Sequence, residues 1–209
     1  LLVGCGGSSL GLEALARALR PLERVARRPR LHLIDNTDPS VTLAAMNGLA
    51  PERTQCIVIS KSGDTLDTLA PLGIVDHWYR ASGVDIKRSL SVVTGKNKGG
   101  LRRYAMSSGL TIFDVTEAVG GRYSVLSSVG LLPAAMLGCD VTAMLKGARD
   151  TRDQALTAAV ADNGPLMLAA TSTTMLRDKQ RSTIVFMPYA TRLRTFGDWA
   201  CQLWAESLG

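Results

Sequence analysis

The sequence predicts an α/β fold in which five parallel strands form a doubly wound sheet with helices on both faces. Over the first 115 residues, short apolar runs alternate with segments of helical periodicity, and this alternation is typical of a parallel sheet. Glycine is frequent, at 20 of 209 residues. Together with the many short apolar runs, this favours strand-loop-helix units over a helical bundle.

The predicted strands are residues 1–5, 31–35, 55–60, 89–94 and 110–115. The predicted helices between them are residues 10–20, 41–47, 64–81 and 101–107. Pro21 ends the first helix, and Asp38 before Pro39 provides an N-cap and first helical position for the second. Right-handed crossovers place the carboxyl ends of all five strands at one edge of the sheet.

The remaining residues predict mainly helices. A long apolar helix is expected from Gly120 to about residue 138, and a second, capped by Asp140, reaches about residue 161. Turn residues at 162–165 precede a helix over 165–177, a strand over 182–187 and a helix from about 191. We therefore predict a first α/β domain over 1–138, a helical connection over 139–164 and the beginning of a second α/β domain over 165–209. The chain starts with leucine and stops within a helical pattern, so we expect a fragment.

Composition narrows the class of partner. The net charge of +6 suits an anionic ligand. The basic clusters at residues 27–30 and 96–103 contain no interleaved aromatic side chains, so we interpret them as solvated surface rather than a nucleic-acid site. No apolar run is long enough to span a membrane, and no signal peptide is visible.

Cysteine and histidine usage argues against a metal site. The four cysteines are Cys5, Cys56, Cys139 and Cys201, all far apart, and the only histidines are His32 and His77. We expect neither a zinc site nor a disulfide framework, and a reducing cytoplasm fits best. Cys5 and Cys56 lie in apolar runs and are interpreted as small core residues.

The loop after the third strand has the composition of a phosphate site. Ser60, Ser62 and Thr65 supply hydroxyl donors, and Gly63 allows close approach of the backbone. The following helix offers free N–H groups and the positive end of its dipole. Lys61 adds a point charge. The alternative is that these residues simply form a strand-to-helix turn.

The loop after the first strand, Gly-Cys-Gly-Gly-Ser-Ser at residues 4–9, has two possible roles. With Asp35 at the end of strand two it approaches a dinucleotide fingerprint, but Ser9 replaces the last glycine or alanine. Alternatively, Gly7 and Ser8 let a phosphate or a sugar approach. In the strand order 2-1-3-4-5, the flavodoxin-like order, this loop lies beside the third-strand loop at the topological switch point, where ligands bind.

Two further positions carry chemistry. Arg122 follows Gly120-Gly121 at a predicted helix start, so it is either an anion clamp or a surface arginine after a flexible turn. Gln202 and Glu206, four residues apart, share one helical face. Flanking Trp204, Ala205 and Leu208 would partly desolvate Glu206, which suits a general base; an exposed glutamate near a helix end is the alternative.

Four segments together resemble the glucose-6-phosphate isomerase family: residues 3–11 (VGCGGSSLG), 59–63 (ISKSG), 119–124 (VGGRYS) and 202–209 (QLWAESLG). Gly-Gly-Arg-Tyr-Ser and Ala-Glu-Ser-Leu-Gly are quite specific to that family, and the third-strand loop is shared among sugar-isomerase domains. The resemblance covers the whole chain and implies a fold of two sugar-isomerase α/β domains, of which this chain holds the first and the beginning of the second.

The resemblance implies interconversion of glucose 6-phosphate and fructose 6-phosphate through an enediolate, with neither cofactor nor metal, in a cytoplasmic homodimer. By motif, Ser60, Ser62 and Thr65 hold the phosphate with Lys61 in the same loop, Gly7 and Ser8 line the sugar, Arg122 stabilises the enediolate, and Glu206 moves the proton between C1 and C2 with Gln202 beside it.

Asp64 departs from the family pattern, because the family usually has threonine there. An acid at this place repels a phosphate unless it points outward as a helix cap. The resemblance also implies that a histidine and a lysine from the later half open the sugar ring. Neither is present in a matching motif, so we expect the chain alone to be inactive. The alternative function is a non-catalytic, regulatory sugar-phosphate-binding module of the same fold.

Overall fold

The computed structural model describes residues 1–19, 29–96, 99–157 and 159–209. Their contacts define two compact units, one of Leu1–Cys139 with Pro188–Gly209 and the other of Asp140–Met187. The domain boundaries predicted after residues 138 and 164 remain predictions. The predicted helix end at Pro21 and the cluster residues Arg27, Arg28, Asn97 and Lys98 lie outside the described residues.

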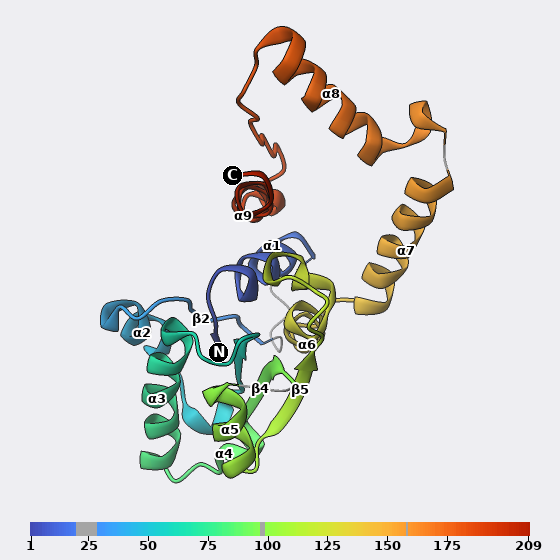
Figure 1. The fold of residues 1–209 in the computed structure, drawn as a ribbon. Helices are drawn as coiled ribbons and strands as arrows, with labels where there is room; N and C mark the ends of the chain where they lie inside the picture. Colours follow the sequence, from blue (N-terminus) through green and yellow to red (C-terminus); the bar gives the residue numbers. More distant parts are fainter. Residues whose placement is uncertain (20–28, 97–98, 158) are drawn as a thin grey trace. The chain divides into compact units, whose positions relative to one another are not determined.

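The first unit is built on a five-stranded parallel sheet with the order β2-β1-β3-β4-β5 (Figure 1), which confirms the predicted fold class. The strands are β1 (Leu2–Val3), β2 (Leu33–Ile34), β3 (Cys56–Ser60), β4 (Leu90–Gly95) and β5 (Thr111–Val115). Ser60 of β3 is paired in register with Thr94 of β4, and Thr94 with Asp114 of β5. The loops that follow these strands therefore leave the same edge of the sheet.

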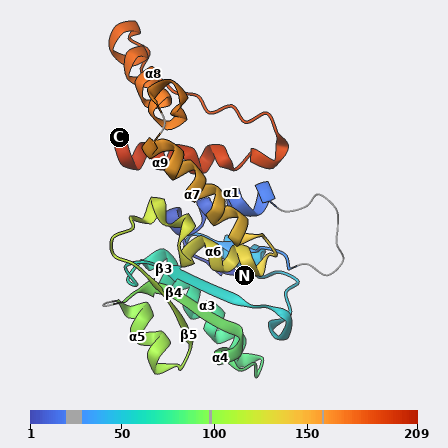
Figure 2. The ribbon, with the colours of Figure 1, turned by 90° about the vertical axis from the view of Figure 1, so that its right-hand side faces the viewer.

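Helices cover both faces of this sheet. They are α1 (Leu10–Leu19), α2 (Pro39–Met46), α3 (Leu66–Ala81), α4 (Ile86–Ser89), α5 (Gly100–Ser107) and α6 (Ser128–Met136). The last helix of this unit, α9 (Phe196–Leu208), packs on α1. Figure 2 shows α3 and α5 on one face and α1 with α6 on the other, as a doubly wound sheet requires. No described helix has the length and apolarity needed to cross a bilayer.

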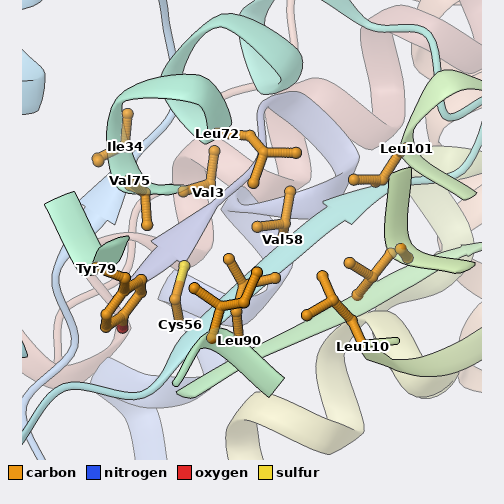
Figure 3. Close-up of a cluster of buried hydrophobic side chains, with 13 residues drawn as sticks. Val3, Ile34, Cys56, Val58, Leu72, Val75, Tyr79, Leu90, Leu101 and Leu110 are labelled. Atoms are coloured by element: carbon orange, nitrogen blue, oxygen red, sulfur yellow. The ribbon is translucent and has the colours of Figure 1, made fainter. Parts of the chain in front are cut away.

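A cluster of buried apolar side chains lies between the sheet and the helices α3 and α5 (Figure 3). Alternate strand residues such as Val58 and Val92 point into it and meet Leu72, Val75 and Leu101 of the helices. Complete burial of such side chains contributes about 1.5–3 kcal/mol each. Cys56 belongs to this cluster, and burial raises the pKa of its thiol to about 12.

The start of α2 confirms the predicted cap, whereas the helix predicted over residues 120–138 is divided in two. Asp38 Oδ1 accepts a hydrogen bond from Ser40 N at 2.8 Å, at the start of α2. The single helix expected over residues 120–138 is instead the 3-10 helix η3 (Gly121–Leu126) followed by α6. Ser127 separates them because its backbone is extended and its hydroxyl caps α6, accepting from Val129 N at 3.3 Å.

The second unit contains α7 (Val141–Thr157), the short 3-10 helix η4 (Val160–Asp162) and α8 (Gly164–Lys179). Asp140 caps α7 as predicted, through a 2.9 Å bond from Ala143 N. The strand predicted for residues 182–187 is wrong, since residues 180–189 form neither helix nor strand. A strand needs a neighbour for its N–H and C=O groups, and none of the described segments pairs with this one. Val185 and Met187 are accordingly exposed, at 69% and 64%.

Candidate active site

The loop between β3 and α3 brings three hydroxyl groups together. Ser60 Oγ lies 3.0 Å from Thr65 Oγ1 and 3.4 Å from Ser62 Oγ, and the last two atoms are 3.2 Å apart. Gly63 N donates to Ser60 Oγ at 3.1 Å, and Gly63 adopts a φ of +75° that favours glycine. Ser60 is buried whereas Ser62 is exposed, so the trio forms a polar surface that opens outward at the start of α3.

Asp64 faces the neighbouring helix. Its Oδ1 accepts a hydrogen bond from Gly100 N, the first residue of α5, at 2.7 Å. Leu101 N donates to Gly63 O at 2.8 Å, which ties the same loop to the same helix a second time. The carboxylate thus stabilises an N-terminus, as expected for an outward helix cap, although the helix is α5 and not its own α3.

Lys61 reaches the loop that follows β5. Its Nζ donates to Glu117 O at 3.0 Å and to Val119 O at 2.6 Å. Its backbone O accepts from Gly95 N at 3.1 Å. The ammonium group therefore links the hydroxyl-rich loop to the segment that leads into Arg122.

The loop after β1 packs against the backbone of η3. Gly7 lies in the 3-10 helix η1 (Gly6–Ser8), and a Cβ at Gly7 would lie 2.5 Å from Gly121 O and 3.0 Å from Arg122 N. Ser124 Oγ donates to Gly121 O at 2.6 Å and approaches Gly7 O at 3.3 Å. The absence of a side chain at Gly7 is thus needed for protein packing. Ser8 is half-buried in the same turn.

Gln202 and Glu206 lie on helix α9. This helix belongs to the same compact unit as the sheet and packs on α1, which brings both side chains to the site. The contact is close, since a Cβ at Gly11 of α1 would lie 3.2 Å from Trp199 Nε1. Gln202 Nε2 donates to Glu206 Oε1 at 2.9 Å. Gln202 Oε1 is buried and has no hydrogen-bond partner in the described part of the chain.

Arg122 of η3 lies close to the Glu206 carboxylate of α9. Arg122 NH1 lies 3.8 Å from Glu206 Oε2, and Arg122 Nε donates to Ser207 Oγ at 2.9 Å. The Glu206 side chain is 47% exposed. Trp204 and Leu208 are exposed as well, so the expected desolvation of Glu206 by its helix neighbours is wrong.

The arrangement suits one class of chemistry. A carboxylate that can take and return a proton lies beside a permanent cation that can stabilise negative charge on oxygen. Lys61 connects a hydroxyl-lined helix start to the backbone segment that leads into that arginine. Among the described residues, no group of three or more histidine, cysteine, aspartate or glutamate side chains could hold a metal ion.

Comparison with known proteins agrees with this chemistry. The family model described as phosphoglucose isomerase matches residues 1–209. The chain belongs to the phosphoglucose isomerase family. The resemblance inferred from the four sequence motifs is thereby confirmed.

Individual members of the family show how much of a protein the chain represents. It is 39% identical over 210 residues to glucose-6-phosphate isomerase of Thermus thermophilus, covering 100% of this chain and 49% of that protein. It is 36% identical over 216 residues to the Carboxydothermus hydrogenoformans enzyme of the same name, covering 100% of this chain and 46% of that protein. The chain spans about half the length of the curated relatives it matches.

Solved structures give the same result. A glucose-6-phosphate isomerase from Chlamydia trachomatis superposes with a TM-score of 0.87 at 28% identity, covering 99% of this chain and 39% of that one. A hypothetical protein from Thermus thermophilus superposes with a TM-score of 0.88 at 39% identity, covering 100% of this chain and 48% of that one.

The structure brings six of the predicted site residues together in two groups. Arg122, Gln202 and Glu206 are one group, and Ser60, Ser62 and Thr65 are the other. Sequence reasoning missed Ser207 as a partner of Arg122, and it gave Tyr123 only as part of a motif. Ser207 is 85 positions from Arg122 and 84 from Tyr123 in the sequence, so no spacing rule could have found these contacts.

Proposed function

We propose that this chain supplies the phosphate loop, the cation and the base of a glucose-6-phosphate isomerase, which interconverts glucose 6-phosphate and fructose 6-phosphate. The observation that supports this most is the 3.8 Å approach of Arg122 to Glu206 between two elements far apart in sequence. The Lys61 bridge adds support, because it joins the hydroxyl trio to the Arg122 segment.

In the proposed mechanism Glu206 removes the proton from C2 of the open-chain aldose. The C2–H electrons form the C1–C2 double bond of an enediolate, and negative charge develops on O1. Arg122 stabilises that charge, and an arginine suits the task because it is always protonated. Return of the proton to C1, with transfer of the hydroxyl proton from O2 to O1, gives the ketose. Gln202 holds Glu206 Oε1 and leaves Oε2 on the Arg122 side.

The phosphate of the sugar is proposed to bind at Ser60, Ser62 and Thr65. In the structure these hydroxyls bond mainly to one another, and each can turn its proton toward an anion. The start of α3 adds unpaired N–H groups. Gly7 and Ser8 are proposed to border the sugar, with Gly7 also needed for packing against Gly121.

Thr65→Val in the full-length protein tests the phosphate loop. We expect KM for glucose 6-phosphate to rise about tenfold with little change in kcat, because one charge-assisted hydrogen bond worth about 1.5 kcal/mol is lost. Steady-state kinetics measures both constants. Thr54→Val is the matched control, since its hydroxyl bonds Ala50 O before β3 begins. An unchanged KM for Thr65→Val contradicts the assignment.

Lys61 is proposed to act through the Arg122 segment. In Lys61→Met the carbonyl groups of Glu117 and Val119 lose the hydrogen bonds from the Lys61 ammonium. We expect kcat to fall about tenfold, with the inhibition constant of inorganic phosphate unchanged. Exposed Lys87 of α4, replaced by methionine, is the control. If phosphate inhibition weakens about tenfold while kcat stays normal, Lys61 is a phosphate ligand instead.

The function itself is tested with the complete protein. We expect purified full-length protein to convert fructose 6-phosphate to glucose 6-phosphate in an assay that detects the product. The alternative is a non-catalytic regulatory module that binds the same sugar phosphates. Binding of fructose 6-phosphate without any conversion would favour that module over the isomerase.

Further properties follow from the same proposal. We propose a cytoplasmic homodimer that acts in glycolysis and gluconeogenesis, with a second sugar-isomerase domain beginning at about residue 165. Ring opening is assigned to residues outside this chain, so the 209 residues alone are expected to be inactive.

A further inference from the structure

Two residues that have no role in the proposed reaction, Ser207 and Tyr123, hold the Arg122 side chain. Arg122 Nε donates to Ser207 Oγ at 2.9 Å. Tyr123 Oη lies 2.8 Å from the same Ser207 Oγ. The guanidinium carbon of Arg122 lies 4.9 Å from the centre of the Tyr123 ring. The guanidinium is therefore held at Nε by a hydroxyl and lies over an aromatic ring.

This arrangement orients the guanidinium with respect to Glu206. Nε is the nitrogen nearest the side-chain stem, so its bond to Ser207 sets the rotation of the whole planar group. With that rotation, NH1 lies 3.8 Å from Glu206 Oε2. An unrestrained arginine loses rotamer entropy when it is ordered. A cation that is already oriented does not have to be ordered while charge develops.

The hydrogen-bonding capacity of Ser207 suits this task. A serine hydroxyl can accept from Arg122 Nε and donate to Tyr123 Oη at the same time. Hydrogen bonding to Ser207 and to Arg122 lowers the pKa of Tyr123. Ser207 follows Glu206 in α9 and Tyr123 follows Arg122 in η3. The contact therefore joins the two elements that carry the base and the cation.

We infer that Ser207 and Tyr123 are positioning residues that hold the Arg122 guanidinium beside Glu206, ready to stabilise the enediolate. The inference rests on the proposed isomerase function. It assigns both side chains an effect through Arg122, so they are not required to touch the substrate.

Ser207→Ala in the full-length enzyme is the test. We expect kcat to fall about tenfold, the loss of one hydrogen bond to a charged group, and KM to stay within about twofold. Two inhibitors distinguish an effect on the transition state from an effect on binding of the ground-state substrate. Affinity for a phosphorylated hydroxamate that mimics the enediolate should fall about tenfold, while affinity for glucitol 6-phosphate should not change.

Conservative variants keep the test independent of folding. Ser207→Thr retains the hydroxyl and should restore most of kcat. Tyr123→Phe retains the ring over Arg122 and removes only the hydroxyl, so it should lose less activity than Ser207→Ala. Ser107→Ala is the matched control, because its hydroxyl bonds Tyr104 O at the end of α5, outside the site. Thermal unfolding of each variant shows whether it is folded.

Two results would overturn the inference while the isomerase function stands. One is a folded Ser207→Ala variant with normal kcat and normal hydroxamate affinity. The other is an equal loss of affinity for both inhibitors, which indicates a general disturbance of the site. If Ser207→Ala does not fold, the inference is also overturned by a normal kcat of Tyr123→Phe together with a kcat of Ser207→Thr that stays well below the wild-type value. A wild-type full-length protein that does not isomerise refutes the proposed function instead.

Discussion

Glu206→Gln in the full-length protein is expected to lower kcat by about 10²–10⁴-fold, the usual contribution of a positioned general base. Glutamine has nearly the same size, and its amide oxygen can still accept the 2.9 Å bond from Gln202 Nε2. It cannot take a proton from C2. Substrate should therefore still bind, with KM within a few-fold of the wild-type value, and steady-state kinetics in both directions measures the two constants.

The matched control for this variant is Glu52→Gln. Glu52 is exposed in the short 3-10 helix η2 (Pro51–Arg53), which precedes β3 and so lies toward the other edge of the sheet. Its replacement should leave both constants unchanged. Normal turnover by Glu206→Gln would remove the base role from this residue, and a large rise in KM alone would assign it to substrate binding.

Gly7→Ala is expected to impair the site through the backbone. The new Cβ would lie 2.5 Å from Gly121 O, 2.6 Å from Gly121 C and 3.0 Å from Arg122 N. These are backbone atoms that cannot rotate away, so the Arg122 segment must shift. A displacement of about 1 Å at a catalytic group can cost about 100-fold in rate. We therefore expect kcat to fall by about that factor, with a lower melting temperature.

Gly73→Ala on α3 provides the comparison. Among the described residues, no atom beyond the adjoining helix backbone and the two neighbouring residues lies within 4 Å of a Cβ at that exposed position. Alanine there should leave activity unchanged and stabilise the helix by up to about 1 kcal/mol. A Gly7→Ala enzyme with wild-type kcat and melting temperature would show that η1 and η3 do not pack as described.

The sheet and the phosphate loop could be predicted because both are local in sequence. Val58 and Val92 belong to short apolar runs that repeat with a helix between them, and a parallel order then follows from right-handed crossovers. Ser60 and Thr65 stand at the end of a strand and the start of a helix, where their chemistry is legible without coordinates. The Asp38 cap was predictable for the same reason.

Long-range contacts could not be predicted from the residues alone. The Lys61 ammonium is directed to carbonyl groups 56 and 58 positions away, so its direction depends on how two loops meet. Glu206 was expected to be shielded by its helix neighbours, but Trp204 lies on exposed surface. The segment at 182–187 has the composition of a strand, yet a strand forms only where a partner supplies hydrogen bonds.

The central claim is that one carboxylate, Glu206, moves the proton between C1 and C2. The most direct measurement follows the label of [2-²H]glucose 6-phosphate by NMR during turnover by the full-length enzyme. The wild-type enzyme should move deuterium from C2 to C1 of fructose 6-phosphate and lose part of it to water, and Glu206→Gln should do both at least about 100-fold more slowly. Deuterium transfer or loss that continues at the wild-type rate in Glu206→Gln would contradict the claim.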